Sequence, residues 1–126
     1  MANLSHLNRV LAVEDEGIIL MDLEGTLLEA RVQEVVGAAS TQEAIVALET
    51  TQFDAAVLDL HIGNSWSHEV ARRLRALRIP FIFTSGSAEA VEDFREVPLI
   101  TKPFSADQLL AALLQVTTGR NLEAAE

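Results

Sequence analysis

The sequence predicts an α/β domain with a parallel sheet, because short apolar segments alternate with longer amphipathic segments five times along the chain. Each apolar segment has the length of a strand and contains no polar residue, which is typical of strands buried on both faces of a parallel sheet. These segments are 10–13, 35–39, 55–58, 81–83 and 99–100. The pattern therefore predicts a doubly wound sheet with right-handed crossovers and helices on both faces.

The segments between the strands have the apolar spacing of helices. Two of the helix starts carry capping signals, because Ser40 and Glu43 form a capping box and Ser105 is a typical N-cap. The segment 88–94 is short, acidic and weakly periodic, so it predicts a poor fourth helix. The apolar positions of the other helices are Ile19, Leu23 and Leu27; Ala44 and Leu48; Val70, Leu74 and Leu77; and Leu109, Leu113 and Val116.

Length and composition predict one domain and exclude several functions. The chain has 126 residues, with a core expected at about 8–118 and frayed termini. Its formal charge of -10 disfavours direct binding to nucleic acid. The absence of cysteine excludes a disulfide framework, a thiolate metal site and a cysteine nucleophile. Without a signal peptide or an apolar stretch of roughly 20 residues, we expect a cytoplasmic protein without a membrane segment.

Polar residues follow the strands at the sheet edge where doubly wound folds form their sites. Loops are polar in general, which offers a simpler explanation for any one of these residues. However, Lys102 is the only lysine among nine basic residues, and it belongs to this set. The set comprises Glu14 and Asp15 after the first strand, Asp59 after the third, Thr84 and Ser85 after the fourth, and Lys102 after the fifth.

This combination of residues favours phosphoryl chemistry. Three neighbouring carboxylates need a counter-charge to stay ionised, and Mg²⁺ with oxygen ligands suits a small acidic site. Asp59 is the candidate nucleophile, which would form an acyl phosphate. Lys102 would supply a compact positive charge, and Ser85 would donate a hydrogen bond to a phosphoryl oxygen.

Four motifs, in this order, resemble the receiver domain of two-component response regulators. They are VLAVEDE at 10–16, LD at 58–59, PFIFTSG at 80–86 and KPF at 102–104. The resemblance covers nearly the whole chain and implies a flavodoxin-like (βα)5 fold with strand order 2-1-3-4-5. It also implies that a sensor histidine kinase or a histidine phosphotransfer protein phosphorylates an aspartate of this domain.

The resemblance assigns roles to individual residues. Asp59 becomes the phosphoacceptor, and Glu14 with Asp15 becomes the acidic pair. Asp15 and Asp59 would hold Mg²⁺ directly, together with the backbone carbonyl of His61, while Glu14 would act through water. Lys102 becomes the lysine that interacts with the phosphoryl group, and its peptide bond to the following proline is expected to be cis.

The segment 80–86 resembles the PFxFATG subfamily, whose members are often single-domain regulators served by HWE or HisKA2-type histidine kinases. Ser85 stands five residues after Pro80 and takes the position of the switch hydroxyl, so Thr84-Ser85 replaces the Ala-Thr of that motif. Leu99 occupies the usual position of a tyrosine or phenylalanine. Without this ring, the signal is expected to pass through the backbone after Ser85 and the weak helix at 88–94.

Two surface features allow more than one interpretation. Acidic residues on the face formed by the fourth helix, fifth strand and fifth helix suggest a docking surface for a basic partner, or simply an acidic surface. Trp66 either packs over the third helix or anchors a partner. The acidic residues are Glu89, Glu92, Asp93, Glu96 and Asp107.

The leading hypothesis is a stand-alone receiver without an output domain, which switches protein–protein interactions when phosphorylated. The alternative is a receiver-like protein-binding module that works without phosphorylation. We do not expect an enzyme, because His61 occupies the position where aspartate-dependent phosphatases carry a second aspartate. A nucleotide-binding domain is also disfavoured, because neither G-x-G-x-x-G nor a P-loop motif is present.

Overall fold

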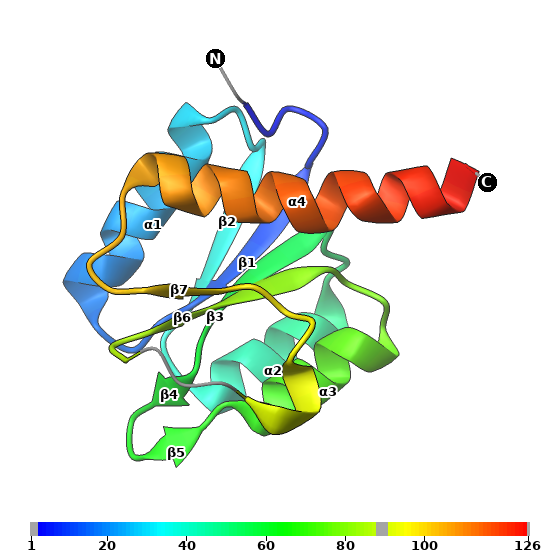
Figure 1. Ribbon diagram of the computed structural model, residues 1–126. Helices are drawn as coiled ribbons and strands as arrows, with labels where there is room; N and C mark the ends of the chain where they lie inside the picture. Colours follow the sequence, from blue (N-terminus) through cyan, green and yellow to red (C-terminus); the bar gives the residue numbers. More distant parts are fainter. Residues whose placement is uncertain (1–2, 88–90, 126) are drawn as a thin grey trace.

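The computed structural model describes residues 3–87 and 91–125 and contains a five-stranded parallel sheet (Figure 1). The strand order is β2-β1-β3-β6-β7, which confirms the predicted order when the strands of this sheet are counted along the chain. The bounds are β1 (Arg9–Val13), β2 (Glu34–Ala38), β3 (Ala55–Asp59), β6 (Phe81–Ser85) and β7 (Leu99–Thr101).

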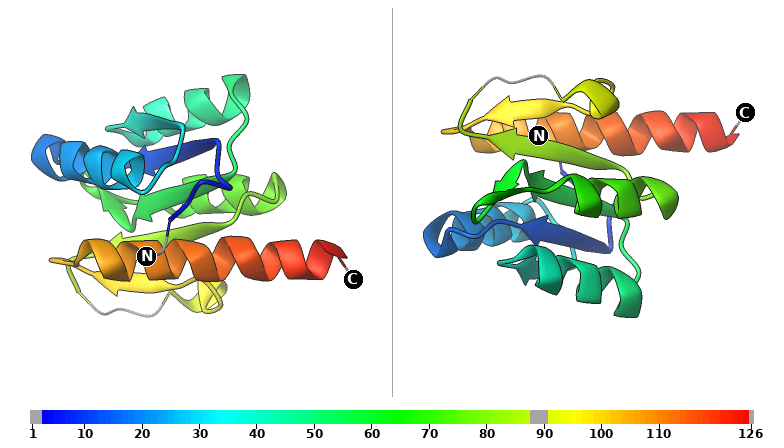
Figure 2. Two further views of the ribbon diagram at one scale, coloured as in Figure 1. Left: turned by 90° about the horizontal axis from the view of Figure 1, so that it is seen from above. Right: turned by 90° about the horizontal axis from the view of Figure 1, so that it is seen from below.

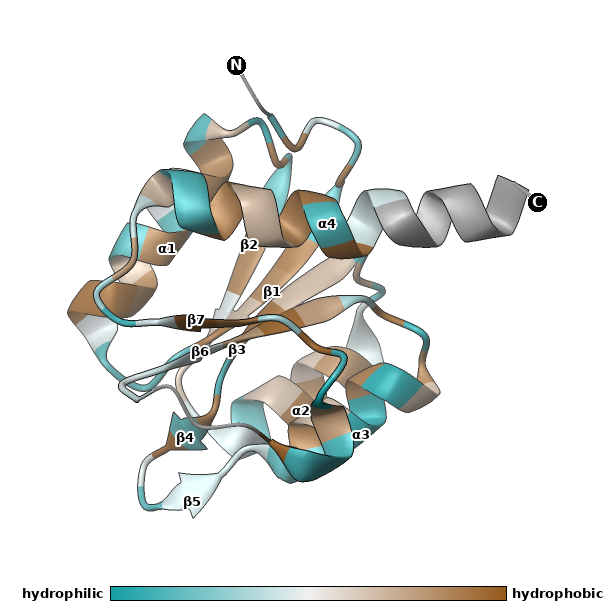
Figure 3. Ribbon diagram, viewed as in Figure 1, coloured by the Kyte–Doolittle hydropathy of each residue, from teal (hydrophilic) through white to brown (hydrophobic). Residues whose placement is uncertain are grey.

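Helices cover both faces of the sheet, as predicted for a doubly wound domain (Figure 2). α1 (Gly17–Glu29) and α4 (Ala106–Ala125) pack on one face, and α2 (Thr41–Thr50) and α3 (His68–Ala76) pack on the other. Hydrophobic residues therefore concentrate along the strands, while polar residues occupy the outer sides of the helices (Figure 3). Because strand residues alternate between faces, Val57 and Ile82 join one core cluster and Leu58 and Phe83 the other.

The predicted caps hold the starts of α2 and α4. The backbone N–H of Glu43 donates to Ser40 Oγ at 3.1 Å, and the Glu43 carboxylate accepts from the N–H of Ala39 at 3.0 Å. Ser105 makes a fully reciprocal capping box with Gln108, through bonds of 3.1 and 2.8 Å.

In the described residues 91–94, the segment expected to form the weak fourth helix contains a 3-10 turn and no α-helix. Residues 88–90 lie outside the described residues, and η1 (Glu92–Phe94) is a single 3-10 turn. Phe94 is 2% exposed and packs edge-on against Phe81 and Phe83. The Phe94 ring therefore belongs to the core on the α2 and α3 face of the sheet. Leu77, expected on the inner face of α3, is exposed because that helix ends at Ala76.

A small antiparallel hairpin between β3 and α3 was not predicted from the sequence. It consists of β4 (His61–Ile62) and β5 (Ser65–Trp66) and projects near the carboxyl ends of the large sheet (Figure 1). Gly63 in its turn has φ +62°, a conformation that side chains with a Cβ rarely adopt. The two strands are too short to show an alternating pattern, so the residue pattern does not predict them.

Candidate functional site

Three carboxylates meet where β1 and β3 end. Glu14 and Asp15 follow β1 directly, and Asp59 is the last residue of β3. One carboxylate oxygen from each lies within 4.8 Å of the others, so the group could hold a metal ion. Glu14 and Asp59 are buried, whereas Asp15 is exposed. Carboxylate oxygens are the ligands that Mg²⁺ and Ca²⁺ prefer, so this donor set fits a hard divalent cation.

Lys102 supplies positive charge to the same group. Its Nζ lies 2.8 Å from Glu14 Oε1 and 2.9 Å from Asp59 Oδ2. The backbone N–H of Lys102 donates to the carbonyl of Ser85 at 2.7 Å, which fixes the base of the lysine beside the end of β6. The peptide bond between Lys102 and Pro103 is cis, as the resemblance implied. The structure thus brings together Glu14, Asp15, Asp59 and Lys102, as predicted.

Burial and pairing shift the protonation of two of these groups. Burial raises the pKa of the Glu14 carboxyl, although the ammonium of Lys102 and the backbone N–H of Glu16 oppose the shift. Burial alone would lower the pKa of Lys102, but the attraction of its ammonium to the carboxylates of Glu14 and Asp59 outweighs burial and raises that pKa. Lys102 therefore stays fully charged at neutral pH.

The hairpin is attached to the acidic group at two points. The backbone N–H of His61 donates to Asp59 Oδ1 at 3.2 Å, and the backbone N–H of Gly63 donates to Asp15 Oδ2 at 2.9 Å. The His61 side chain is exposed and its ring lies 4.0 Å from that of Trp66. His61 therefore contacts the site through its backbone.

Ser67 is a buried site residue that sequence reasoning missed. Its hydroxyl lies 2.6 Å from the carbonyl oxygen of Asp59 and 3.1 Å from that of Leu60, and its N–H also donates to Leu60. Its place just before α3 resembles an ordinary N-cap, yet its side chain makes no capping bond. These bonds close the base of the hairpin onto the backbone of the candidate phosphoacceptor.

Two hydroxyl residues end β6 and are almost fully buried. Ser85 is 0% exposed, and its Oγ accepts a hydrogen bond from the N–H of Ser87 at 3.2 Å. Thr84 is 1% exposed and lies opposite Asp59 in the register of β3 and β6. The structure thus places Ser85 at the end of the strand beside the one that carries Asp59.

Trp66 packs within a row of rings and is also exposed. Its ring is stacked on that of His68 with 5.6 Å between centroids, and His68 is stacked in turn on Phe94 at 6.1 Å. These separations are within the range of favourable aromatic contacts. Packing at the start of α3 is therefore confirmed, although 48% of Trp66 remains exposed.

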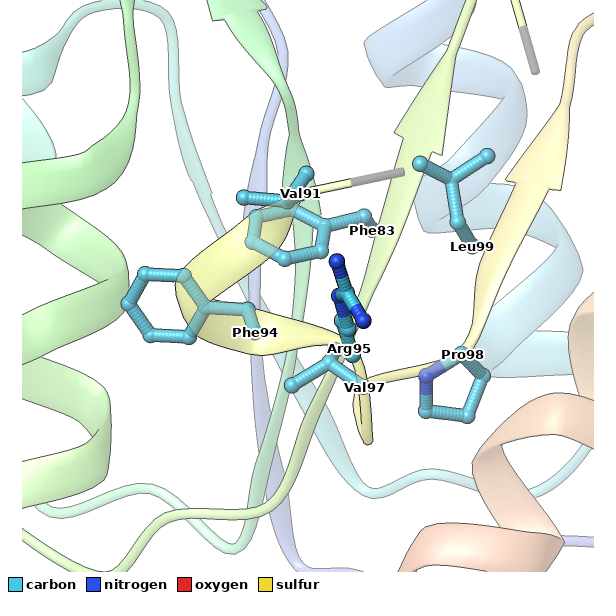
Figure 4. A pocket seen from close by; sticks show the side chains of 7 residues that line it. All are labelled: Phe83, Val91, Phe94, Arg95, Val97, Pro98 and Leu99. Carbon is cyan, nitrogen blue, oxygen red and sulfur yellow. The ribbon is translucent and has the colours of Figure 1, made fainter. Parts of the chain in front are cut away.

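A pocket of about 370 Å³ lies between η1 and β7, with Phe83 and Phe94 in its lining and Arg95 beside them (Figure 4). Leu99, at the position that the resemblance assigns to an aromatic ring, also lines it. Val91, Val97 and Pro98 complete the lining. The site edge and this pocket lie on the same two strands, because Ser85 ends β6 and Leu99 begins β7.

A family model for the response regulator receiver domain matches residues 10–114. This chain belongs to that family. Its receiver fold also matches solved structures. A response regulator receiver protein from Sinorhizobium medicae WSM419 is 27% identical, with a TM-score of 0.77 over 90% of this chain and 96% of that one. No curated protein matches this receiver domain significantly.

Two further structures broaden this comparison. SdrG from Sphingomonas melonis Fr1 is 35% identical, with a TM-score of 0.74 over 90% of this chain and 98% of that one. The anti-anti-sigma factor PhyR from Bartonella quintana is 28% identical, with a TM-score of 0.80, and the receiver covers 50% of its length. The PFxFATG subfamily stays a prediction. Within the described part of the receiver, no helix is long and apolar enough to cross a membrane.

Proposed function

We propose that this receiver accepts a phosphoryl group on Asp59 and thereby changes its affinity for a partner protein. The observation that carries the proposal is the environment of Asp59. Its carboxylate is buried beside two other acidic residues and lies 2.9 Å from the only lysine in the chain. Buried carboxylates with a dedicated ammonium partner are suited to nucleophilic phosphoryl transfer.

The donor would be a phosphohistidine of a sensor histidine kinase, of the HWE or HisKA2 type, or of a histidine phosphotransfer protein. An oxygen of Asp59 attacks the phosphorus, the P–N bond breaks, and its electron pair returns to the imidazole nitrogen. Lys102 neutralises charge on the phosphoryl oxygens during this step. Because such kinases use ATP, the protein would act in the cytoplasm. Its role would be that of a signalling module, not of an enzyme.

Mg²⁺ is the proposed cofactor. Asp15, Asp59 and the backbone carbonyl of His61 would hold it, and Glu14 would act through water. When bound, the cation offsets the negative charge of the acidic group and of the phosphoryl oxygens. The donor set contains only oxygen, which favours Mg²⁺ over metals that prefer nitrogen or sulfur ligands.

Ser85 is the proposed switch residue. Its Oγ already accepts a hydrogen bond from Ser87, so its own proton is available to a phosphoryl oxygen on Asp59. Movement of Ser85 toward that oxygen would pull on the backbone that leads into η1. Leu99 has no aromatic ring to rotate, so we place the output in this backbone and in the pocket beneath it.

The proposed partner surface is the acidic face around η1, β7 and α4. Glu92, Asp93, Glu96 and Asp107 are exposed there, whereas Glu89 lies outside the described residues. A partner with basic and apolar residues would match these carboxylates and the adjacent pocket. With its acidic surface, the receiver itself is not expected to bind nucleic acid directly.

The test is phosphorylation of the purified chain by acetyl phosphate with Mg²⁺, read by intact mass. We expect an acid-stable, base-labile gain of one phosphoryl group that disappears with EDTA and in Asp59→Asn. Beryllofluoride binding provides a second measurement that needs no phosphodonor. If neither acetyl phosphate nor beryllofluoride acts through Asp59, the phosphorylation-independent binding module becomes the better hypothesis.

A further inference from the structure

Thr84 carries a buried hydroxyl that has no hydrogen-bond partner. Among the described residues, the only buried side-chain polar atoms without such a bond are Thr84 Oγ1 and Glu14 Oε1. Glu14 Oε1 is compensated by the ammonium of Lys102 at 2.8 Å. Thr84 is 1% exposed, so water does not reach its hydroxyl freely. Valine would fill the same space without a buried, unpaired polar group, so the hydroxyl needs an explanation.

The sheet register places this hydroxyl beside the phosphoacceptor. Thr84 lies opposite Asp59 on one side and opposite Ile100 on the other. Residues opposite one another on neighbouring strands point to the same face of a sheet. The core clusters agree, because Ile82, two residues before Thr84, packs on the α1 and α4 face together with Val57, two residues before Asp59.

Lys102 reaches Asp59 across the strand that carries Thr84. β6 lies between β3 and β7, so the lysine crosses β6 to bring its Nζ to 2.9 Å from Asp59 Oδ2. Two strand spacings amount to about 10 Å. Lys102 follows β7 by one residue, and the β6 residue at the level of Asp59 on this face is Thr84. The lysine side chain therefore crosses β6 near the position of the unpaired hydroxyl.

We propose that Thr84 is a positioning residue for Lys102, an inference that rests on the proposed function. The ammonium has three N–H donors; it donates one to Asp59 Oδ2 at 2.9 Å and forms an ion pair with Glu14 Oε1 at 2.8 Å. As phosphoryl transfer converts Asp59 to an acyl phosphate, that carboxylate loses its charge, and the ammonium turns toward the phosphoryl oxygens. Thr84 Oγ1 then accepts one of its hydrogen bonds and keeps the ammonium from rotating into solvent.

Threonine suits this role because its branched Cβ restricts the hydroxyl to few orientations. The side chain is also enclosed by the core, so the acceptor is in place before the lysine moves. Lys102 is 18% exposed and its long side chain has several rotatable bonds, so a fixed acceptor lowers the freedom that the ammonium has to lose in the transition state.

The experiment compares the wild type with Thr84→Val and Thr84→Ser in the full chain. Valine keeps the shape and removes the hydroxyl, whereas serine keeps the hydroxyl. The rate of phosphoryl incorporation from acetyl phosphate with Mg²⁺ is measured by intact mass, and folding is followed by the thermal midpoint. We expect Thr84→Val to fold at least as stably as the wild type but to react about tenfold more slowly, as for loss of one hydrogen bond to a charged group. Thr84→Ser should stay close to the wild type.

A spectroscopic measurement separates positioning from a purely structural role. Because Lys102 is the only lysine, labelling with ¹⁵Nζ-lysine gives a single ammonium signal. Beryllofluoride should shift that signal, and the shifted position should differ in Thr84→Val but not in Thr84→Ser. Wild-type kinetics and an unchanged ammonium signal in Thr84→Val would overturn this inference alone. Absence of Asp59-dependent incorporation in the wild type would overturn the proposed function and this inference together.

Discussion

The backbone N–H of Gly63 donates a hydrogen bond to the carboxylate of Asp15 at 2.9 Å, although 48 positions separate the two residues. This bond ties the turn of the β4–β5 hairpin to the acidic group. The same carboxylate is a proposed Mg²⁺ ligand. A cation bound at Asp15 would therefore alter the hydrogen bond that ties the hairpin to this carboxylate.

Mg²⁺ should consequently change the fluorescence of Trp66. This is the only tryptophan of the chain, and it pairs with His61 in the hairpin. We expect a saturable change in emission, and Asp15→Asn should weaken the apparent affinity at least about tenfold, because a charged ligand is lost. Asp107→Asn removes an exposed acid on α4 and should leave the titration unchanged. Equal titrations for Asp15→Asn and the wild type would contradict this coupling.

Removal of the lysine charge should destabilise the metal-free protein. Lys102→Met leaves Glu14 and Asp59 without their counter-charge. We expect a loss of about 3 kcal/mol in the free energy of unfolding, the lower end for breaking a buried ion pair, since Lys102 is partly exposed. Urea denaturation in EDTA at pH 7 measures it, and added Mg²⁺ should restore part of the loss. Arg72→Met, at an exposed arginine on α3, is the control; a similar loss in both variants would refute the assignment.

The raised pKa of Glu14 predicts a pH dependence. A carboxyl whose pKa is higher in the folded state stabilises the fold below its unfolded value of 4.5, and this contribution is lost as the pH rises through the folded value. Glu14→Gln lacks this titration. In EDTA, the free energy of unfolding of Glu14→Gln should therefore rise relative to the wild type between pH 4.5 and 7.5. A difference that is constant across these pH values would show that Glu14 does not titrate as its burial implies.

Ser85→Ala should separate phosphorylation from switching. The variant keeps Asp59, Lys102 and the acidic pair, so phosphoryl incorporation should continue. The hydrogen bond to the phosphoryl oxygen is lost, so beryllofluoride should cause weaker chemical-shift changes in η1 and at Leu99 in amide NMR spectra. Ser65→Ala, in the exposed hairpin, is the matched control. Full-size changes in Ser85→Ala would assign the switch to another residue.

Replacement of the two capping serines should reduce the stability of the fold additively. Ser40→Ala and Ser105→Ala should each cost about 1 kcal/mol in the free energy of unfolding. The caps begin helices on opposite faces of the sheet, so the double variant should lose about the sum. Replacement of either serine by glycine should cost only a few tenths of a kcal/mol. A neutral Ser105→Ala would mean that Gln108 alone holds the start of α4.

The parts of the fold that repeat a simple physical pattern could be predicted from the sequence. Continuous apolar segments indicated the parallel strands, and the change to charged or hydroxyl residues at their ends indicated the site. Lys102 was identifiable because it is the only lysine. The acidic group and its lysine partner therefore followed from strand topology, without knowledge of side-chain geometry.

Other features depend on contacts that a linear pattern does not contain. The hairpin is held by hydrogen bonds from backbone N–H groups to the carboxylates of Asp59 and Asp15. Every residue except proline has such an N–H group, so the sequence does not indicate which ones form these bonds. Ser67 looked like one more helix cap, and only the fold shows that its hydroxyl faces two carbonyl groups. The unpaired hydroxyl of Thr84 was likewise invisible, because the sequence identifies a polar group but not whether a partner is within reach.

The hydrogen bonds of Ser67 allow the tip of the hairpin to vary in sequence without a change in the acidic group. Its hydroxyl and N–H hold the base of the hairpin, and the turn beyond Gly63 is exposed. Residues inserted after Asn64 would leave this closure and the bond between Gly63 and Asp15 in place. The tip of the hairpin can therefore change in length and sequence independently of the chemistry beneath it. Sequence changes at the tip would alter contacts with a proposed kinase and leave the surroundings of Asp59 unchanged. For the same reason, the tip is a suitable place to display a grafted peptide.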